Sequence, residues 1–430
     1  MICVSTRGAA PPVPFRDALL AGLAPDGGLY VPEALPVLPE QQWAELRGGS
    51  MADVGAAMLT PLIGDEIAAD HLKGLLADAL NFPVPVVRLD DQLAVVELFH
   101  GPTFAFKDVG ARVLARLMSH FHAEGQPPLT VLVATSGDTG GAVAQAFHGV
   151  ARTRVVVLYP HGQVSGVQEA QFTTLGGNVA AVAVHGTFDD CQRLAKEAFG
   201  DARLRARAHL TSANSISLGR LLPQMVYYAH AVLRLEPGAR PVVTVPSGNF
   251  GNVAAGLMAR RMGVPIERFV AATTVNDTVP RYLATGQVEP RPSVSTLANA
   301  MDVGNPSNLE RIRWMFGDRV DAIRAAMVAS VHTDEDVRRG IRELDARYGY
   351  VADPHTAIAY LGAVEDPGPA GEGAPGRLFL STAHPAKFGD VVEPVIGRPV
   401  PIPLPLAEAM RRPRQVTHID PRLDALAPLL

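Results

Sequence analysis

The chain has 430 residues, a length that suggests two to three domains and is ample for a buried core. Apolar residues make up 47% and charged residues 19%, which is typical of a globular rather than a disordered protein. A formal charge of −5 and a pI near 6.2 give no electrostatic reason to expect nucleic acid or anionic membranes as partners. No apolar run suits a signal peptide or a membrane span, so we expect a cytoplasmic protein.

Three regions follow one another along the chain. Residues 1–90 are predicted to form a separate, mostly helical N-terminal domain that ends in the proline-rich linker 82–87. Residues 91–400 alternate between short apolar strands and helices and are predicted to form the main core. Residues 401–430 are expected to be a C-terminal tail.

The pattern in the main core predicts an α/β fold. Strands are expected at 131–134, 154–159, 179–184 and 242–245, and helices at 109–121, 188–199, 218–235 and 252–262. Short apolar strands separated by helices favour parallel sheets with helices on both faces. The stretch 365–377 is expected to be a surface loop. Its G-x-G-x-x-G match neither follows a strand nor opens a helix, so it predicts no dinucleotide site.

Lys107 lies in the stretch 97–108, where Phe104 and Phe106 give its amine apolar neighbours. Burial among such side chains disfavours the charged form and lowers the pKa, as an amine requires to act as a nucleophile or to form a Schiff base. Asp108, the next residue, is predicted either to oppose this shift or to cap the helix. For an arbitrary lysine, a side chain that extends to solvent is the common alternative.

Two glycine-bearing turns each join an apolar strand to a helix. In residues 246–252, Gly248 and Gly251 allow the backbone close to a ligand, and N–H groups can converge on an anion at the helix N-terminus. Residues 135–140 form a second such turn, for which a tight turn with Asp138 as helix cap is an equally good interpretation. A reactive lysine and a phosphate cradle are the minimal set for holding pyridoxal phosphate.

Two further polar stretches are candidates for ligand contacts. Residues 212–217 and Arg220 combine hydroxyls, an amide and a guanidinium before a helix, as a phosphate or carboxylate clamp would. An ordinary helix cap with a surface arginine explains the same pattern and is favoured by spacing alone. Residues 381–388 follow an apolar strand, and a hydroxyl there is predicted either to contact a ligand or to cap a turn. The histidines show no metal-ligand spacing, and neither do the cysteines Cys3 and Cys191, so no metal is expected.

These motifs, taken together and in order, resemble those of the threonine synthase family of pyridoxal-phosphate enzymes. The resemblance covers nearly the whole chain, including segments 27–33, 97–108, 134–140, 212–216, 246–251, 275–280, 299–302 and 382–388. It implies a tryptophan-synthase-type (fold type II) core, in which two α/β lobes surround the cofactor cleft after a helical N-terminal domain. It also implies conversion of O-phospho-L-homoserine and water to L-threonine and phosphate.

The resemblance assigns roles to residues of this chain. Lys107 is implied to be the catalytic residue, joined to the cofactor as a Schiff base, and Thr382 is implied to face the pyridine nitrogen. The implied cofactor-binding residues are Lys107, Asp138, Gly248, Asn249, Phe250, Gly251, Asn252 and Thr382. The implied substrate-binding residues are Ser136, Thr139, Ser215 and Arg220. The chain departs from the family's pattern at Ser217, often Asn in the family, and at Gly219, commonly not glycine. Because serine donates only one hydrogen bond, the share of the clamp carried by Ser217 stays open.

The implied reaction removes a proton from Cα and another from Cβ, releases phosphate from Cγ and adds water at Cβ. Lys107 is expected to shuttle the protons, and the departing phosphate, held by Arg220, could be the base for water. Two alternatives are a related phospho-lyase that releases a keto acid and a non-catalytic, metabolite-binding homologue. The second predicts loss of Lys107 or of the glycine cradle, and both are present. The sequence is compatible with a monomer or a homodimer.

Overall fold

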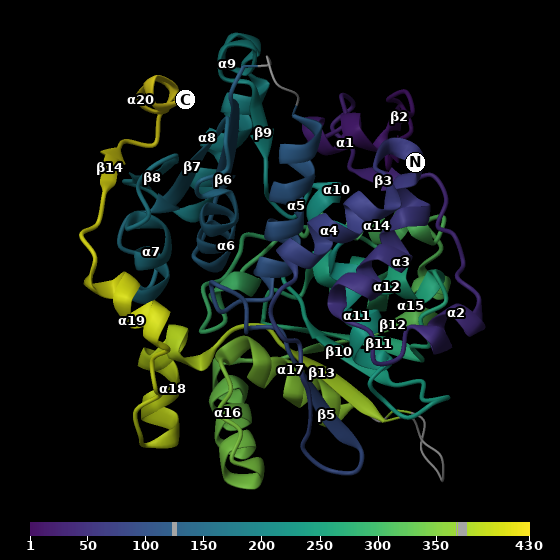
Figure 1. Cartoon of the computed structure of the whole chain (residues 1–430). Coiled ribbons are helices and arrows are strands. Elements are labelled where there is room, and N and C mark those ends of the chain that lie inside the picture. The colour runs from purple at the N-terminus through teal and green to yellow at the C-terminus, as the bar shows by residue number, and fades with distance from the viewer. Residues whose placement is uncertain (123–126, 367, 369–375) are drawn as a thin grey trace.

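Two sheets, one parallel and one mostly parallel, form the centre of the molecule, and a small antiparallel sheet lies near the N-terminus (Figure 1). The computed structural model describes residues 1–122, 127–366, 368 and 376–430. The prediction of an α/β fold with parallel sheets covered by helices is confirmed. Most of the predicted glycine- and proline-rich loop at 365–377 lies outside the described residues.

The N-terminal region combines the small sheet with helices. Its strands pair in the order β2 (Val13–Pro14), β1 (Ile2–Ser5) and β3 (Tyr30–Pro32). The helices are α1 (Phe15–Ala21), α2 (Glu40–Glu45), α3 (Met51–Ile63) and α4 (Ala69–Ala79). Leu19 of α1 and Met58 of α3 lie in the same apolar core as Leu114 and Met225, which belong to helices of the main region. The N-terminal region therefore shares its core with the rest of the chain, and a domain boundary near residue 90 stays a prediction.

One lobe is built on a five-stranded parallel sheet in the order β14-β8-β7-β6-β9. Its strands are β6 (Leu129–Ala134), β7 (Thr153–Pro160), β8 (Val179–Val184), β9 (Leu210–Ser212) and β14 (Val416–Ile419). Its helices are α5 (Lys107–Phe121), α6 (Asp138–Phe147), α7 (Gly166–Thr173), α8 (Phe188–Gly200), α9 (Ala202–Ala208) and α20 (Leu423–Leu426).

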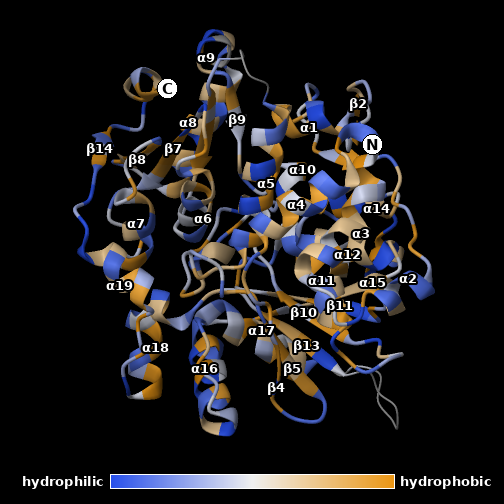
Figure 2. Ribbon diagram, in the orientation of Figure 1, coloured by the Kyte–Doolittle hydropathy of each residue, from blue (hydrophilic) through white to orange (hydrophobic). Residues whose placement is uncertain are grey.

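Both faces of this sheet are buried, because alternate residues of a strand point to opposite sides. Val131 and Val155 pack into the core that contains α5 and α6, whereas Leu132 and Val156 pack with Leu194 of α8. Figure 2 shows the result as strands in hydrophobic colours between helices that carry hydrophilic stretches.

The other lobe is built on a six-stranded sheet in the order β12-β11-β10-β13-β5-β4, parallel except for β4. Its strands are β4 (Val86–Arg88), β5 (Leu93–Glu97), β10 (Val242–Pro246), β11 (Arg268–Thr273), β12 (Met327–Val331) and β13 (Arg377–Ser381). Its principal helices are α11 (Gln224–Val232), α12 (Gly251–Arg261), α16 (Asp334–Tyr348) and α17 (Pro354–Glu365). Shorter helices are α10 (Leu218–Leu221), α13 (Thr278–Thr285), α14 (Leu309–Met315), α15 (Val320–Ala326), α18 (Gly389–Ile396) and α19 (Leu404–Arg411).

Two segments differ from the structure predicted for them. The prediction of a single helix at 218–235 is wrong, because Pro223 separates α10 from α11. Proline has no N–H to donate within a helix, and its ring clashes with the preceding turn. The region expected to be a tail, 401–430, contains α19, β14 and α20, and β14 extends the five-stranded sheet. The chain end thus returns to the lobe that contains Lys107 (Figure 1).

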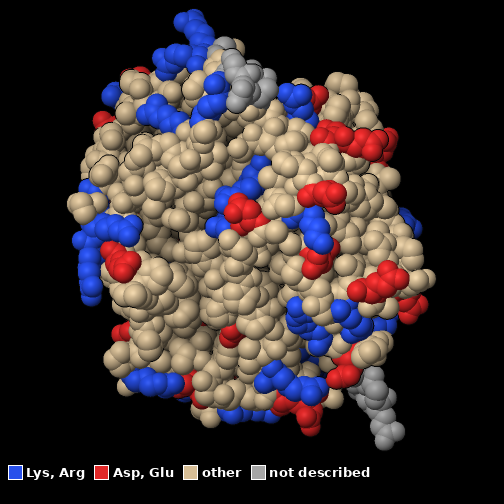
Figure 3. All heavy atoms as spheres, viewed as in Figure 1, with Lys and Arg blue, Asp and Glu red and all other residues tan. Residues whose placement is uncertain are grey.

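Charged side chains of both signs are interspersed on the face seen in Figure 3, with broad uncharged areas between them. This face carries no continuous basic surface. Within the described residues, no helix is both long enough and apolar enough to cross a bilayer.

Candidate active site

A cavity of about 420 Å³ lies where strands of both sheets end. Asp138 and Ser215 follow β6 and β9 of one lobe, and Gly248 and Thr382 follow β10 and β13 of the other. The carboxyl ends of parallel strands are where α/β folds bind ligands. All the residues that the sequence pattern and the resemblance assigned to the site line this cavity: Lys107, Ser136, Asp138, Thr139, Ser215, Arg220, Gly248, Asn249, Phe250, Gly251, Asn252 and Thr382.

Lys107 begins helix α5 and places its amine inside the cavity. The side chain is 13% exposed, and Nζ lies 4.8 Å from the centroid of the Phe106 ring and 3.8 Å from Oδ2 of Asp138. Burial lowers the pKa of Lys107 to about 8; Asp138 acts in the opposite direction, and the nearby charge of Lys387 lowers it further. The downward shift expected from apolar neighbours is therefore present, and this amine loses its proton near pH 8 rather than near the ordinary 10.5.

We expect this shift to be measurable in the cofactor-free protein. Because only the uncharged amine is a nucleophile, acetylation of Lys107 by a trace of acetic anhydride should rise with a midpoint near pH 8 rather than the ordinary 10.5. Peptide mass spectrometry across a pH series measures the rate, with exposed Lys73 as the internal reference. A midpoint for Lys107 at or above that of Lys73 would contradict the described environment.

A buried ion pair lies beside this amine. Nζ of Lys387 is 2.5 Å from Oδ1 of Asp138 and donates a second hydrogen bond, 2.9 Å long, to the Thr103 carbonyl. Nε2 of Gln168 also donates to Asp138, at 2.9 Å. Although burial opposes ionisation of Asp138, the Lys387 and Lys107 ammoniums hold its pKa below its usual range. The carboxylate is thus charged and fixed in place. Lys387 was not predicted as a site residue, although it lies in the segment 381–388.

Asp108 does not pair with Lys107. Its carboxylate accepts hydrogen bonds from the Thr103 amide (2.8 Å) and hydroxyl (2.6 Å), and so closes the turn that precedes α5. Burial raises the pKa of Asp108 to about 6. The carboxylate that opposes the pKa shift of Lys107 is Asp138, 31 residues further along the chain (138 − 107). The expectation that Asp108 tunes Lys107 or caps its helix is therefore wrong.

The turn at residues 247–252 has the geometry of an anion cradle. A Cβ on Gly248 would lie 2.6 Å from the Cα of Met301, so only glycine fits there. Phe250 has a left-handed backbone (φ 60°), and Gly251 opens helix α12, whose first N–H groups have no partner within the helix. The side chain of Asn249 is fixed by a donated bond to Ser215 Oγ (2.5 Å) and an accepted bond from Ser307 N (2.6 Å).

The turn at residues 135–140 faces this cradle from the other lobe. The Thr135 hydroxyl accepts from the amides of Gly137 (2.9 Å) and Gly140 (2.8 Å), which holds Ser136 and Thr139 at the cavity wall. Asp138 is not a helix cap. The N-cap residue of α6 is Gly137, which makes no side-chain hydrogen bond, and the Asp138 carboxylate instead binds Lys387 and Gln168.

Arg220 places a buried guanidinium at the cavity, rather than the surface arginine that spacing alone favoured. The residue is 4% exposed, and its NH1 group donates to the Ala213 carbonyl at 2.8 Å. Its Nε has no protein partner, and among the described residues no carboxylate lies within 4.0 Å of the guanidinium. Burial lowers its pKa to about 10, and the charge of Asp108 partly offsets this. A buried cation without a paired anion at a cavity wall indicates an anionic ligand.

The two departures from the family's pattern lie beside Arg220. Ser217 is fully buried, its hydroxyl has no hydrogen-bond partner among the residues described, and it is not part of the cavity wall. A Cβ on Gly219 would lie 2.1 Å from Cδ1 of Leu19 and 2.7 Å from Cδ1 of Leu114. Glycine at 219 therefore allows the clamp segment to pack closely against α1 and α5.

Sequence patterns missed two groups that shape the cavity. Arg311 is fully buried and donates to the carbonyls of Tyr30, Ser215 and Ile216, so it fixes the clamp segment to the N-terminal region. His355 lines the cavity, and its Nδ1 lies 2.6 Å from a carboxylate oxygen of Asp353. Arg311 reaches carbonyls far from it in sequence, whereas Asp353, two residues before His355, is a local signal that the sequence analysis did not use.

Comparisons with known proteins agree with this geometry. Residues 82–377 match the family model of the pyridoxal-phosphate dependent enzymes, residues 3–80 the threonine synthase N terminus and residues 356–429 the threonine synthase C-terminal model. Threonine synthase from Serratia marcescens is 45% identical over 92% of this chain and 91% of its own, and that from Escherichia coli K12 is 43% identical over 97% and 96%. The PLP-bound crystal structure of threonine synthase from Brucella melitensis aligns with a TM-score of 0.94 at 39% identity, covering 100% of this chain and 98% of that one.

The residues present fit pyridoxal phosphate: an amine with a lowered pKa, a glycine cradle at a helix N-terminus and a fixed carboxylate meet in one cavity. Fold and site define a pyridoxal-phosphate-dependent enzyme of fold type II. The chain belongs to the threonine synthase family and is a lyase of that family. The two alternatives, a keto-acid-releasing phospho-lyase and a non-catalytic homologue, are not favoured.

Proposed function

We propose that this chain converts O-phospho-L-homoserine and water to L-threonine and phosphate, with the substrate phosphate bound by Arg220 and Ser215. The observation that carries the proposal is the buried Arg220 guanidinium, which has no carboxylate partner in the part of the chain that the structure describes. Lys107, Lys387 and Arg220 bring three basic groups to a region where Asp138 is the paired acid. Such a surplus of positive charge favours a substrate with a phosphate group.

We assign separate roles to the two ends of the cavity. Residues 248–252 would hold the phosphate of the cofactor, and Asp138 and Thr382 would bind polar groups of its ring. When bound, the cofactor withdraws electrons from Cα of the substrate and so makes its proton acidic. Ser136 and Thr139 bind the substrate from the turn at residues 135–140, where the Thr135 hydroxyl fixes the backbone.

Lys107 moves the protons in this proposal. Its amine, which gives up its proton more readily because burial lowers its pKa to about 8, accepts the proton from Cα and later returns one. A second proton leaves Cβ as phosphate departs from Cγ, and a proton is then delivered to Cγ, which becomes the methyl group of threonine. Arg220 holds the charge of the departing phosphate. Water then supplies a hydroxyl to Cβ, so that one water is consumed for each phosphate released. The phosphate on Arg220 is within the same cavity and is our candidate base for that water.

We further propose that the enzyme acts in the cytoplasm. We propose that it acts as a monomer or a homodimer. We propose residues 1–90 as the N-terminal domain and 91–400 as the catalytic core, with 401–430 as an extension that completes one sheet.

Replacement of Arg220 by lysine tests the phosphate clamp. Lysine keeps the charge but loses the planar pair of donors, so we expect KM for O-phospho-L-homoserine to rise about 10- to 100-fold. Bound cofactor, measured by absorbance, should stay at the wild-type level because the Arg220 guanidinium donates to the Ala213 carbonyl and not to the cradle. The control is Arg240→Lys, which changes an exposed arginine paired with Glu267. A wild-type KM in Arg220→Lys would show that another group binds the phosphate.

A further inference from the structure

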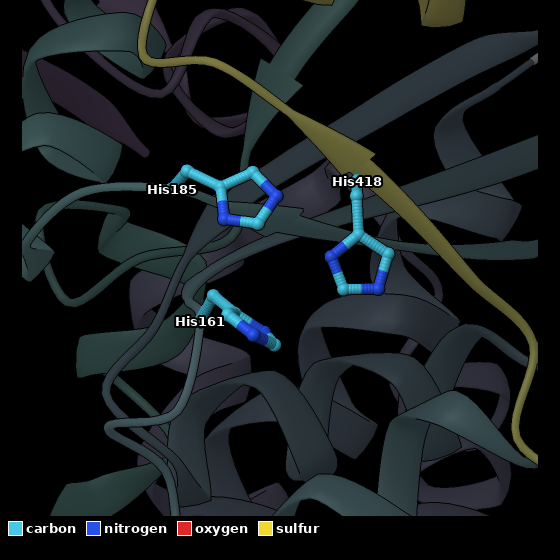
Figure 4. Close-up of side chains that lie close together, drawn as sticks. All are labelled: His161, His185 and His418. Atoms are coloured by element: carbon cyan, nitrogen blue, oxygen red, sulfur yellow. The ribbon is translucent and has the colours of Figure 1, made fainter.

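Three histidines from distant parts of the chain gather at one corner of the five-stranded sheet. They are His161, His185 and His418, all exposed, and one nitrogen from each lies within 4.8 Å of the others. Their ring centroids form a nearly equilateral triangle with sides of 5.1, 5.0 and 5.3 Å. Figure 4 shows the three rings around a common space, with His418 extending from β14. None of them lines the active-site cavity.

The sheet fixes this arrangement. Tyr159, Ala183 and His418 are opposite one another on β7, β8 and β14, so their side chains share one face. His161 and His185 come two residues after Tyr159 and Ala183, which continues that face beyond the strand ends.

The backbone at each histidine is also tied to the neighbouring strand. The amide of His161 donates to the Val184 carbonyl and the amide of His185 donates to the Ile419 carbonyl, each at 2.9 Å. His418 lies within the paired strand β14. The backbone positions are therefore set by the sheet, whereas the exposed rings are free to rotate.

We propose that His161, His185 and His418 bind one divalent transition-metal ion, with Zn²⁺ as the best match. Neutral imidazole is a preferred ligand of zinc, and three histidines with a water as fourth ligand make a complete tetrahedral site. Zn–N bonds of roughly 2.0–2.1 Å place tetrahedral nitrogens about 3.3 Å apart. The present separations, up to 4.8 Å, are closed by small rotations of exposed rings. The site lies outside the active-site cavity, and its ion would join the C-terminal strand β14 to β7 and β8.

The test uses the untagged, full-length holoenzyme. Equilibrium dialysis against Zn²⁺, with elemental analysis of the protein, should give one bound ion per chain that His161→Ala, His185→Ala and His418→Ala each remove. Since loss of outer partners alone weakens metal sites by about 10- to 100-fold, loss of a ligand should weaken binding by at least that much. His71→Ala is the matched control, because His71 and His120 form a separate exposed pair with nitrogens 3.1 Å apart.

Two further readouts do not depend on activity. Co²⁺ in place of Zn²⁺ should give the visible absorption of a tetrahedral ion in wild type and His71→Ala, and not in the three histidine variants. Zn²⁺ should also slow hydrogen exchange of the β14 amides in wild type, with no such effect in His161→Ala. Zinc binding that survives the three substitutions, binding lost in His71→Ala, or no zinc in the wild-type protein would each overturn the proposal.

Discussion

Lys107→Ala should abolish turnover, with a fall in kcat of at least about 10⁴-fold, the upper range for loss of a single acid–base group. The effect is expected to be this large because we propose that the same amine carries the cofactor and moves the substrate protons. Burial lowers the pKa of Lys107 to about 8, and no other amine lines the cavity at comparable burial in the described residues. Steady-state kinetics with O-phospho-L-homoserine measures the fall.

Chemical trapping separates this role from a loss of folding. Borohydride treatment of the wild-type enzyme followed by peptide mapping should place the pyridoxyl group on Lys107. The variant should stay folded, because Asp138 keeps its close contact with Lys387. A small primary amine added to Lys107→Ala should restore part of the activity, and Lys73→Ala should behave as wild type. Label on another lysine, or substantial turnover in Lys107→Ala, would remove Lys107 from the mechanism.

Lys387→Met should destabilise the fold more than any other single change at the cavity, by about 3–5 kcal/mol, as is typical when one partner of a buried ion pair is removed. Methionine fills much of the same space, but Asp138 is then left buried with Lys107 at 3.8 Å as its remaining cation. The pKa of Lys107 should rise above about 8, since a neighbouring positive charge is lost. Urea denaturation measures the stability, and acetylation of the cofactor-free protein measures the pKa.

A surface pair of the same type provides the control. Lys73 lies 2.8 Å from Asp53, with both side chains solvent-exposed, so Lys73→Met should change stability little. The double variant Lys387→Met/Asp138→Asn should regain part of the lost stability, because it leaves no unpaired charge. If the free energy of unfolding of Lys387→Met were no lower than that of Lys73→Met, the ion pair of Asp138 with Lys387 would not stabilise the fold.

Much of the fold could be predicted from local patterns. Short, continuously apolar segments indicated the strands of parallel sheets, and strand β8 (Val179–Val184) has the bounds predicted for it. The turns after β6 and β10 lie at strand ends, where glycines and polar groups reveal a ligand site without knowledge of distant contacts. The break at Pro223 also follows from a local rule, since proline cannot continue a helix.

Several of the missed features depend on contacts between residues far apart in sequence. Lys387 meets Asp138 across 249 positions (387 − 138), and Arg311 reaches Tyr30 across 281. The histidines of the proposed metal site come from β14 and from the ends of β7 and β8, so their sequence spacing resembles no ligand motif. Asp108 was predicted to act on its neighbour Lys107 or to cap the helix, whereas its carboxylate accepts a hydrogen bond from Thr103.

The most direct test of the central claim is the identity of the products formed by the purified holoenzyme from O-phospho-L-homoserine. Proton and phosphorus NMR of one reaction mixture measures the amino acid and the phosphate together. We predict L-threonine and inorganic phosphate in equal amounts, with Arg220→Lys giving the same products at a higher KM. Release of a keto acid in place of threonine, or no consumption of this substrate, would contradict the account.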